Sequence, residues 1–170
     1  MIELNNFTYK TNRILFEEAN FIAPSIGIIG IAGESGCGKT TLLKIISKQI
    51  PVNSLINDSS SIFYGNQDAL LKKDLTIAQQ FELIESVYNR EHDQKTIDEL
   101  FNSLNIKANL SQKYDSCSLG EKKRIMIALS VYSNSPCIIL DEPLSSVDYE
   151  DKHSIMKLSL IHISEPTRRS

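Results

Sequence analysis

The residues best suited to chemistry lie together in one glycine-rich segment. Residues 33–40 read Gly-Glu-Ser-Gly-Cys-Gly-Lys-Thr and satisfy the pattern G-x-x-x-x-G-K-[ST]. In this pattern the backbone N–H groups of a tight turn surround phosphate oxygens, the lysine contacts the β- and γ-phosphates, and the hydroxyl binds Mg²⁺. We therefore predict that Lys39 binds phosphate, that Thr40 binds Mg²⁺ and that Thr41 donates nearer the α-phosphate. The other predicted phosphate-binding residues are Gly33, Ser35, Gly36, Cys37 and Gly38.

A second candidate for chemistry is a pair of acids that follows an apolar run. Residues 137–140 are all apolar and predict a short core strand, which Asp141 and Glu142 follow directly. At the end of such a strand Asp141 can hold Mg²⁺ through its water shell, and Glu142 can face the attacking water. An acidic pair in this position is more commonly a solvated strand end. Its occurrence together with the phosphate-binding segment favours the catalytic interpretation.

Apolar periodicity predicts the elements that must position these residues. Apolar residues dominate 26–31, which predicts a buried strand, and those of 42–46 share one helical face, so the glycine-rich segment joins a strand to a helix. Strand-like runs that alternate with helical periodicity are typical of an α/β domain with a parallel sheet. The strand residues are Ile26, Ile28, Ile29 and Ile31, and the helical residues are Leu42, Ile45 and Ile46.

Three further helices are expected between residues 76 and 132. Each predicted start has the capping-box spacing, in which Ser or Thr precedes Glu or Gln by three residues. The three pairs are Thr76 with Gln79, Thr96 with Glu99, and Ser118 with Glu121. The buried stripes are predicted to be Phe81, Ile84 and Tyr88, then Ile97, Leu100, Phe101 and Leu104, then Ile125, Ala128, Leu129 and Tyr132.

Length and composition narrow the functional classes. The 170 residues carry a net charge of −3 and are 41% hydrophobic, which predicts one domain with an ordinary core. Without a dense basic tract, nucleic acid is not expected as a partner. The longest apolar stretch, 26–32, is too short to span a membrane. Three dispersed cysteines have no metal-ligand spacing, so a soluble protein of a reducing, intracellular compartment is expected.

The order of these motifs resembles the nucleotide-binding domain of ATP-binding cassette (ABC) transporters over residues 1–157. The resemblance implies a P-loop NTPase core, with a parallel sheet and flanking helices, an abbreviated antiparallel β-region and a helical subdomain inserted over about 74–134. It implies an ATPase that uses ATP and Mg²⁺. The resemblance also implies the roles predicted above for four residues of this chain, which are Lys39, Thr40, Asp141 and Glu142.

Further site residues follow from the resemblance alone. Tyr9, 30 residues before Lys39, is at the distance of the aromatic residue that stacks on adenine, with Phe7 as the alternative. Gln67 is similar to the glutamine that contacts the metal and the attacking water and that reports contact with a membrane partner. Asp148 resembles the acid that lies at the dimer interface of the family, near the phosphate loop of the other subunit.

The family signature, commonly Leu-Ser-Gly-Gly-Gln, corresponds to residues 117–121, which read Cys-Ser-Leu-Gly-Glu. The resemblance implies that Ser118 and the amide of Gly120 contact the γ-phosphate held by a second subunit. The alternative is that Ser118 and Glu121 only cap a helix, and both roles are compatible. The neighbouring residues 122–124, Lys-Lys-Arg, predict a solvated helix face, with an anion-binding role as the alternative.

The C-terminal residues depart from the family pattern. The family has a histidine about thirty residues beyond the position of Glu142, which lies past Ser170. Residues 158–168 resemble the translation of a transposase adapter used in sequencing libraries. We therefore expect the natural sequence to end near Lys157, with part of the core missing and 158–170 as a non-native tail. The alternative is a genuine amphipathic C-terminal helix.

Together these observations predict the ATP-hydrolysing subunit of an ABC transporter, cytoplasmic and peripheral on the inner face of the cell membrane. It is expected to pair with a second such subunit, identical or different, and with a separate transmembrane permease. The Ser-Leu-Gly sequence at 118–120 is similar to a variant in exporters, which favours export over import. The alternatives are a soluble ABC ATPase that acts on ribosomes or DNA, and a non-hydrolytic partner cassette.

Overall fold

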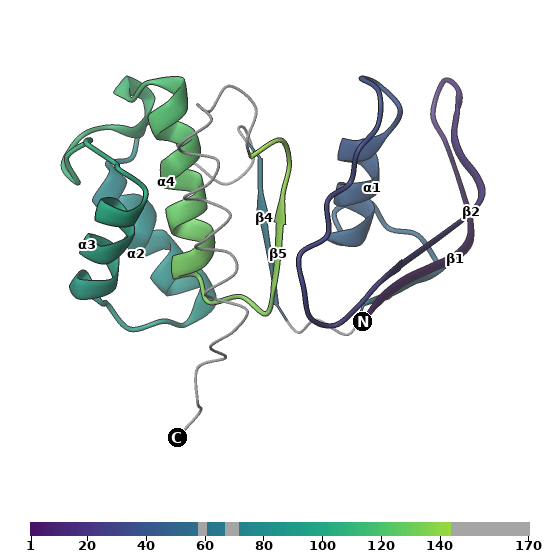
Figure 1. Cartoon of the computed structure of the whole chain (residues 1–170), viewed down its shortest axis with the longest axis horizontal. Helices are drawn as coiled ribbons and strands as arrows, with labels where there is room; N and C mark the ends of the chain where they lie inside the picture. The colour runs from purple at the N-terminus through teal and green to yellow at the C-terminus, as the bar shows by residue number, and fades with distance from the viewer. Residues whose placement is uncertain (58–60, 67–71, 144–170) are drawn as a thin grey trace. The chain divides into compact units, whose positions relative to one another are not determined.

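The computed structural model of the chain describes residues 1–57, 61–66 and 72–143. It divides into two compact units, Met1–Ser60 and Ser61–Ser170, each with its own sheet (Figure 1). The predicted roles of Gln67 and Asp148, and the predicted origin of residues 158–170, lie outside the described residues. Among the described helices, none has the length and apolar content needed to cross a membrane.

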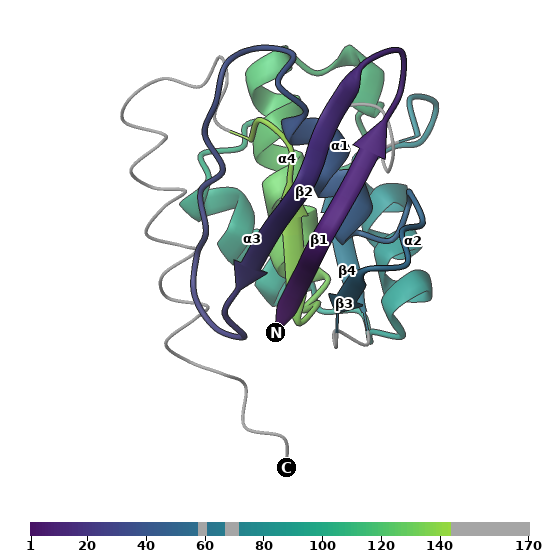
Figure 2. The same ribbon diagram turned by 90° about the vertical axis from the view of Figure 1, so that its right-hand side faces the viewer.

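The first unit is built on an antiparallel hairpin. β1 (Ile2–Lys10) pairs with β2 (Ile14–Ala23) on one edge and with the three-residue strand β3 (Leu55–Asn57) on the other. Figure 2 shows the two long strands side by side. The helix α1 (Lys39–Ile46) contacts β3 and buries Ile45 and Ile46. The short β3 agrees with the expected abbreviated antiparallel region.

The strand predicted at 26–31 is wrong, because residues 24–38 connect β2 to α1 as a loop without assigned strand pairing (Figure 2). Ile26, Ile28 and Ile29 are 77, 54 and 45% exposed. An all-apolar strand is buried only where parallel neighbours and covering helices enclose it. The three strands of this unit instead pair antiparallel with one another, so they provide no such neighbours.

The second unit contains the predicted parallel pairing. β4 (Ile62–Gly65) and β5 (Cys137–Leu140) are parallel and in register from Ile62 with Cys137 to Gly65 with Leu140. Parallel neighbours need a long crossover connection, and here the helices supply it. These are α2 (Ile77–Tyr88), α3 (Gln94–Ser103), the 3-10 helix η1 (Tyr114–Ser116) and α4 (Leu119–Tyr132).

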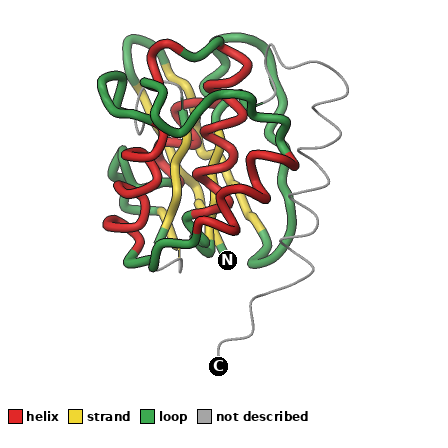
Figure 3. The backbone as a smooth tube through the Cα atoms, turned by 90° about the vertical axis from the view of Figure 1, so that its left-hand side faces the viewer, coloured by secondary structure: helices red, strands yellow, loops and turns green. Residues whose placement is uncertain are grey.

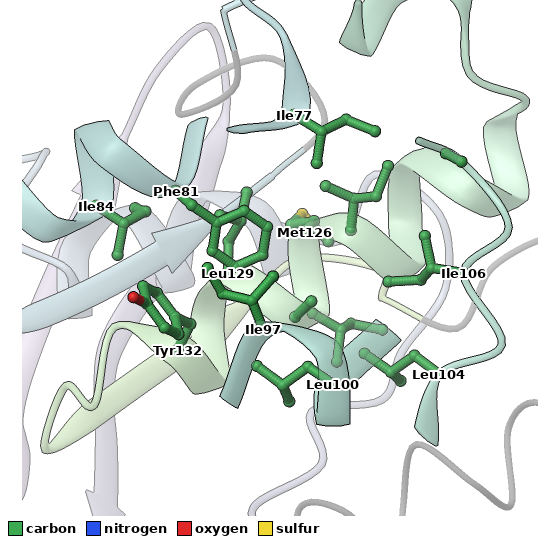
Figure 4. Packing of buried hydrophobic residues seen from close by; sticks show 14 of the residues in the cluster. Ile77, Phe81, Ile84, Ile97, Leu100, Leu104, Ile106, Met126, Leu129 and Tyr132 are labelled. Carbon is green, nitrogen blue, oxygen red and sulfur yellow. The ribbon is translucent and has the colours of Figure 1, made fainter. Parts of the chain in front are cut away.

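The helix α4 lies at the centre of this unit. It contacts α2 and α3 on one side and β4 on the other (Figure 1). Figure 3 distinguishes the helices from the strands by colour. A helix surrounded in this way must be apolar on nearly all sides. The residues Ile125 to Leu129 are all buried, and the ring of Tyr132 lies edge-on to that of Phe81 at 5.0 Å between centroids (Figure 4). The predicted stripes of all three helices line this core.

Two of the three predicted helix starts are confirmed. α2 and α4 have complete capping boxes, from Thr76 with Gln79 and from Ser118 with Glu121. The predicted start at Thr96 is wrong, because α3 begins at Gln94. The Asp93 carboxylate caps this helix by accepting hydrogen bonds from the N–H and the hydroxyl of Thr96, at 3.0 and 2.6 Å. Thr96 thus donates to an acidic cap instead of serving as the cap itself.

The hydroxyl of Tyr132 joins the end of α4 to α2 and to the cap of α3. It donates to the Glu85 carboxylate at 2.6 Å and accepts the N–H of Asp93 at 3.0 Å. The guanidinium of Arg90 lies 4.2 Å from the Tyr132 ring centroid and donates to the Tyr132 carbonyl at 2.6 Å. This network fixes the start of α3 against the end of α4.

We predict that Tyr132→Phe lowers the free energy of unfolding by about 1–2 kcal/mol, because the Asp93 N–H loses its acceptor and the Glu85 carboxylate, which also contacts His92, loses one of its hydrogen bonds. Urea denaturation of the chain measures the change. Val87→Ala, at a position of α2 that is 61% exposed, is the control and should change stability by less than about 0.5 kcal/mol. If Tyr132→Phe is as stable as the parent, the Tyr132 hydroxyl does not make the stabilising hydrogen bonds described above.

Candidate functional site

The glycine-rich loop surrounds the side chain of its own lysine. The Lys39 ammonium donates to the carbonyl oxygens of Gly33 and Glu34, each at 2.8 Å. Lys39 is also the first residue of α1, and Gly38 before it is the N-cap, with a φ of +105°. Gly36 has a φ of +78°, so the turn depends on two glycines in the left-handed region. The loop therefore places a cation at the N-terminus of a helix, where the helix dipole also favours anions.

The β1–β2 hairpin supports this loop from one side. A Cβ atom on Gly38 would lie 3.0 Å from the ring of Phe16, which packs on Phe7 with 5.0 Å between centroids. The guanidinium of Arg13 donates to the Gly36 carbonyl. Arg13 and Phe16 could not be predicted from the sequence, because nothing local in it links a hairpin residue to a loop more than twenty residues later.

An open pocket of about 320 Å³ separates the hairpin turn from the loop. Its lining residues are Arg13, Ile14, Leu15, Glu34, Ser35, Gly36 and Cys37. The predicted residues Ser35, Gly36 and Cys37 are thus brought together on one wall. Tyr9 lies half-buried on β1, opposite Phe16 of β2, and it is on the same hairpin without lining this pocket.

The acidic pair lies at the end of the parallel strands of the second unit. The N–H of Asp141 donates to the Gly65 carbonyl at 2.9 Å, which extends the β4–β5 ladder by one residue. Glu142 follows with a φ of +52° and is exposed. Burial and the negative charge of Asp141 both raise the pKa of the Tyr64 hydroxyl. The left-handed turn at Glu142 takes the chain out of the strand directly after the two carboxylates.

The predicted signature residues begin α4. Ser118 Oγ accepts the Glu121 N–H at 3.3 Å, and the Glu121 carboxylate accepts the N–H and the hydroxyl of Ser118, each at 3.0 Å. These hydrogen bonds from Ser118 hold the pKa of Glu121 below its usual value. Ser118 is exposed and Leu119 is 50% exposed, so this helix N-terminus faces solvent within its unit. The capping role of Ser118 is therefore present in the structure.

The prediction of a solvated face at 122–124 is wrong for its central residue. Lys123 is only 2% exposed. Lys122 lies outside the core and donates to the carbonyl of Asp115 at 2.8 Å. Successive residues of a helix point about 100° apart, so adjacent lysines meet different surroundings.

Two of the predicted metal-binding residues carry oxygen donors of the kind that Mg²⁺ prefers. Thr40 has an exposed hydroxyl and Asp141 a half-buried carboxylate, and each is described within its own unit. Within residues 1–57, 61–66 and 72–143, no group of three or more His, Cys, Asp and Glu side chains could hold a metal ion. Mg²⁺ is commonly held by one or two carboxylates with substrate phosphates and water, so a metal site does not require such a group.

Comparisons with known proteins identify relatives over most of the chain. The family described as ABC transporter matches residues 16–145. The cytochrome c biogenesis ATP-binding export protein CcmA of Reclinomonas americana is 30% identical over 161 residues, 86% of this chain and 72% of that protein. The molybdate import ATP-binding protein MolC of Haemophilus influenzae is 26% identical over 164 residues, 92% of this chain and 65% of that protein.

Solved structures show the same fold. The dimeric structure of MJ0796, a bacterial ABC transporter cassette, superposes with a TM-score of 0.78 at 24% identity. The match covers 97% of this chain and 84% of that one. The P-loop α/β fold predicted from the sequence is therefore confirmed.

We predict that Gly38→Ala destabilises the chain by about 1–2 kcal/mol, because alanine is strained at a φ of +105° and its Cβ would crowd the Phe16 ring. Thermal or urea unfolding measures the loss. Gly30→Ala in the same connection is the matched control, since a Cβ there would meet nothing within 4 Å. If both variants unfold like the parent, the turn does not have the described geometry.

Proposed function

The chain belongs to the ABC transporter family and is an ATP-binding ATPase, and from this premise we propose that it drives a separate transmembrane permease by hydrolysing ATP. The observation that carries the proposal is the Lys39 ammonium, held by two loop carbonyls at the N-terminus of α1. A cation in this position is the charge that a triphosphate requires.

In the proposed mechanism the loop binds the phosphates of ATP. The backbone N–H groups of residues 35–39 donate to phosphate oxygens, and Lys39 exchanges its two carbonyl partners for oxygens of the β- and γ-phosphates. Thr41 adds a donor near the α-phosphate. Tyr9, on the same hairpin as Phe16, is proposed to stack on adenine.

Hydrolysis is proposed to proceed by in-line attack of water on the γ-phosphate. Glu142 orients the water and takes its proton while the new P–O bond forms and the bond to ADP breaks. Thr40 and Asp141 would hold Mg²⁺, with Gln67 as a further ligand, and the ion would neutralise charge on the phosphate oxygens.

A second cassette subunit is proposed to complete each ATP site. Ser118 and the Gly120 amide lie at the exposed N-terminus of α4, where N–H groups and the helix dipole favour an anionic ligand. They would contact the γ-phosphate bound by the other subunit, and Asp148 would lie at the interface between the two subunits. Gln67 would report contact with the permease.

The direction of transport is proposed to be export. Relatives of this chain are named both as export proteins, such as CcmA, and as import proteins, such as MolC. The Ser-Leu-Gly sequence at 118–120 favours export by its similarity to exporters. We propose that the chain acts at the cytoplasmic face of the cell membrane.

We predict that Lys39→Ala weakens the binding of MgATP at least tenfold, because the loop then lacks its cation. Isothermal titration calorimetry with MgATP measures the affinity. Lys44→Ala, which removes the same charge from the same helix, should bind within about twofold of the parent. Equal affinities of all three proteins would contradict the proposed role of the loop.

We predict that Glu142→Gln lowers ATP turnover about a hundredfold or more while MgATP binding is retained, because a general base contributes about 10²–10⁴-fold to such reactions. Phosphate release measures turnover, and calorimetry measures binding. Turnover equal to that of the parent would remove Glu142 from the mechanism. If MgATP binding is lost as well, Glu142 contributes to the binding of ATP before hydrolysis and not only to the hydrolysis step.

A further inference from the structure

Cations from two places in the sequence hold carbonyl oxygens of the glycine-rich loop. The Lys39 ammonium, from the loop itself, donates to the carbonyls of Gly33 and Glu34. The Arg13 guanidinium, from the hairpin, donates to the carbonyl of Gly36. The mechanism above gives Lys39 the phosphates as new partners, and it gives Arg13 no role.

The hairpin places Arg13 at a defined position beside the loop. Arg13 lies in the turn between β1 and β2, where its carbonyl accepts the N–H of Thr11 at 2.9 Å. The turn is closed by the pairing of Lys10 with Ile14. Arg13 and the loop belong to the same compact unit, and both line the open pocket described above. The guanidinium therefore reaches the loop from a backbone that is itself held by hydrogen bonds.

The carbonyl that Arg13 holds belongs to the peptide group between Gly36 and Cys37. In a planar trans peptide the carbonyl oxygen and the N–H point in opposite directions. On the other side of this peptide the Cys37 N–H donates to the Glu34 carbonyl at 3.3 Å, which closes a turn over residues 34–37. The φ of +78° at Gly36, the third residue, is typical of a type II turn. Arg13 thus holds this peptide group from its outer side.

The orientation of this peptide group matters for an anionic ligand. Glycine accepts many backbone conformations, so Gly36 by itself does not fix the orientation. A rotated peptide would turn its carbonyl oxygen, which has a partial negative charge, toward the phosphates and its N–H away from them. In the proposed mechanism Lys39 also leaves the Glu34 carbonyl when ATP binds. The contact from Arg13 lies outside the turn, so it can persist while the inner contacts change.

We propose that Arg13 is a positioning residue for ATP binding, whose guanidinium fixes the Gly36–Cys37 peptide so that the loop N–H groups face the phosphates before ATP arrives. The inference rests on the proposed function of the loop. An arginine side chain keeps its charge and has several N–H donors, so it can hold a carbonyl oxygen at any physiological pH. A loop that is ordered before binding loses less conformational entropy when the ligand binds.

The first test measures MgATP affinity by isothermal titration calorimetry. Arg13→Met removes the N–H donors, and we expect it to raise Kd at least fivefold. Arg13→Lys keeps a cationic donor and should recover at least half of the loss in binding free energy. Lys10→Met is the matched control, because it removes a positive charge from the same hairpin at an exposed position that does not line the pocket. It should bind within about twofold of the parent. An unchanged Kd in Arg13→Met, or an equal loss in Lys10→Met, would overturn the proposal.

Amide hydrogen exchange without nucleotide tests whether Arg13 acts through the loop. We expect the Cys37 N–H to exchange at least fivefold faster in Arg13→Met than in the parent, because its turn is no longer held. The amides of residues 2–4, where β1 pairs with both neighbouring strands, should exchange as in the parent. Equal exchange at Cys37 would overturn the proposal even if MgATP binds more weakly, because Arg13 would then act on the nucleotide directly. Faster exchange at residues 2–4 as well would show a general loss of structure and would also overturn it.

The two measurements separate this inference from the proposed function. If the parent itself bound no MgATP, the proposed function would be refuted, and the role of Arg13 in ATP binding would be refuted with it. If the parent bound MgATP and lost affinity in Lys39→Ala, but Arg13→Met matched the parent in Kd or in Cys37 exchange, only the role of Arg13 would be refuted.

Discussion

The interaction on which the site depends is the hold of the glycine-rich loop on the Lys39 ammonium. Two carbonyl oxygens at 2.8 Å fix the cation, and left-handed glycines at 36 and 38 allow the backbone to curl around it. Arg13 and Phe16 of the hairpin support the same turn. A loop built in this way presents N–H groups and one positive charge to an anion, which is the basis of nucleotide binding in this family.

In the second unit one helix lies next to two parts of the proposed chemistry. The signature residue Ser118 caps α4, and Met126 packs against Gly65, whose carbonyl accepts the N–H of Asp141. The far end of α4 is fixed by the hydrogen bonds of Tyr132. A displacement of α4 would therefore move the predicted signature residues and the surroundings of the two acids together.

Motifs whose geometry is local could be predicted from the sequence, and features that depend on distant partners could not. The phosphate loop, the β5 strand and the capping boxes at Thr76 and Ser118 depend on residues close in sequence. The strand expected at 26–31 requires neighbours that its own unit does not supply. Lys123 was assigned to solvent because charge normally marks an exposed face, whereas α4 is enclosed on nearly every side.

Amide hydrogen exchange in the loop, with and without MgATP, is the most direct test of the central claim. If the backbone of the loop binds the triphosphate through hydrogen bonds, the N–H groups of residues 35–40 should exchange at least tenfold more slowly when MgATP is present. Unchanged exchange at these amides under saturating MgATP would contradict the account, because the nucleotide would then be bound elsewhere or not at all.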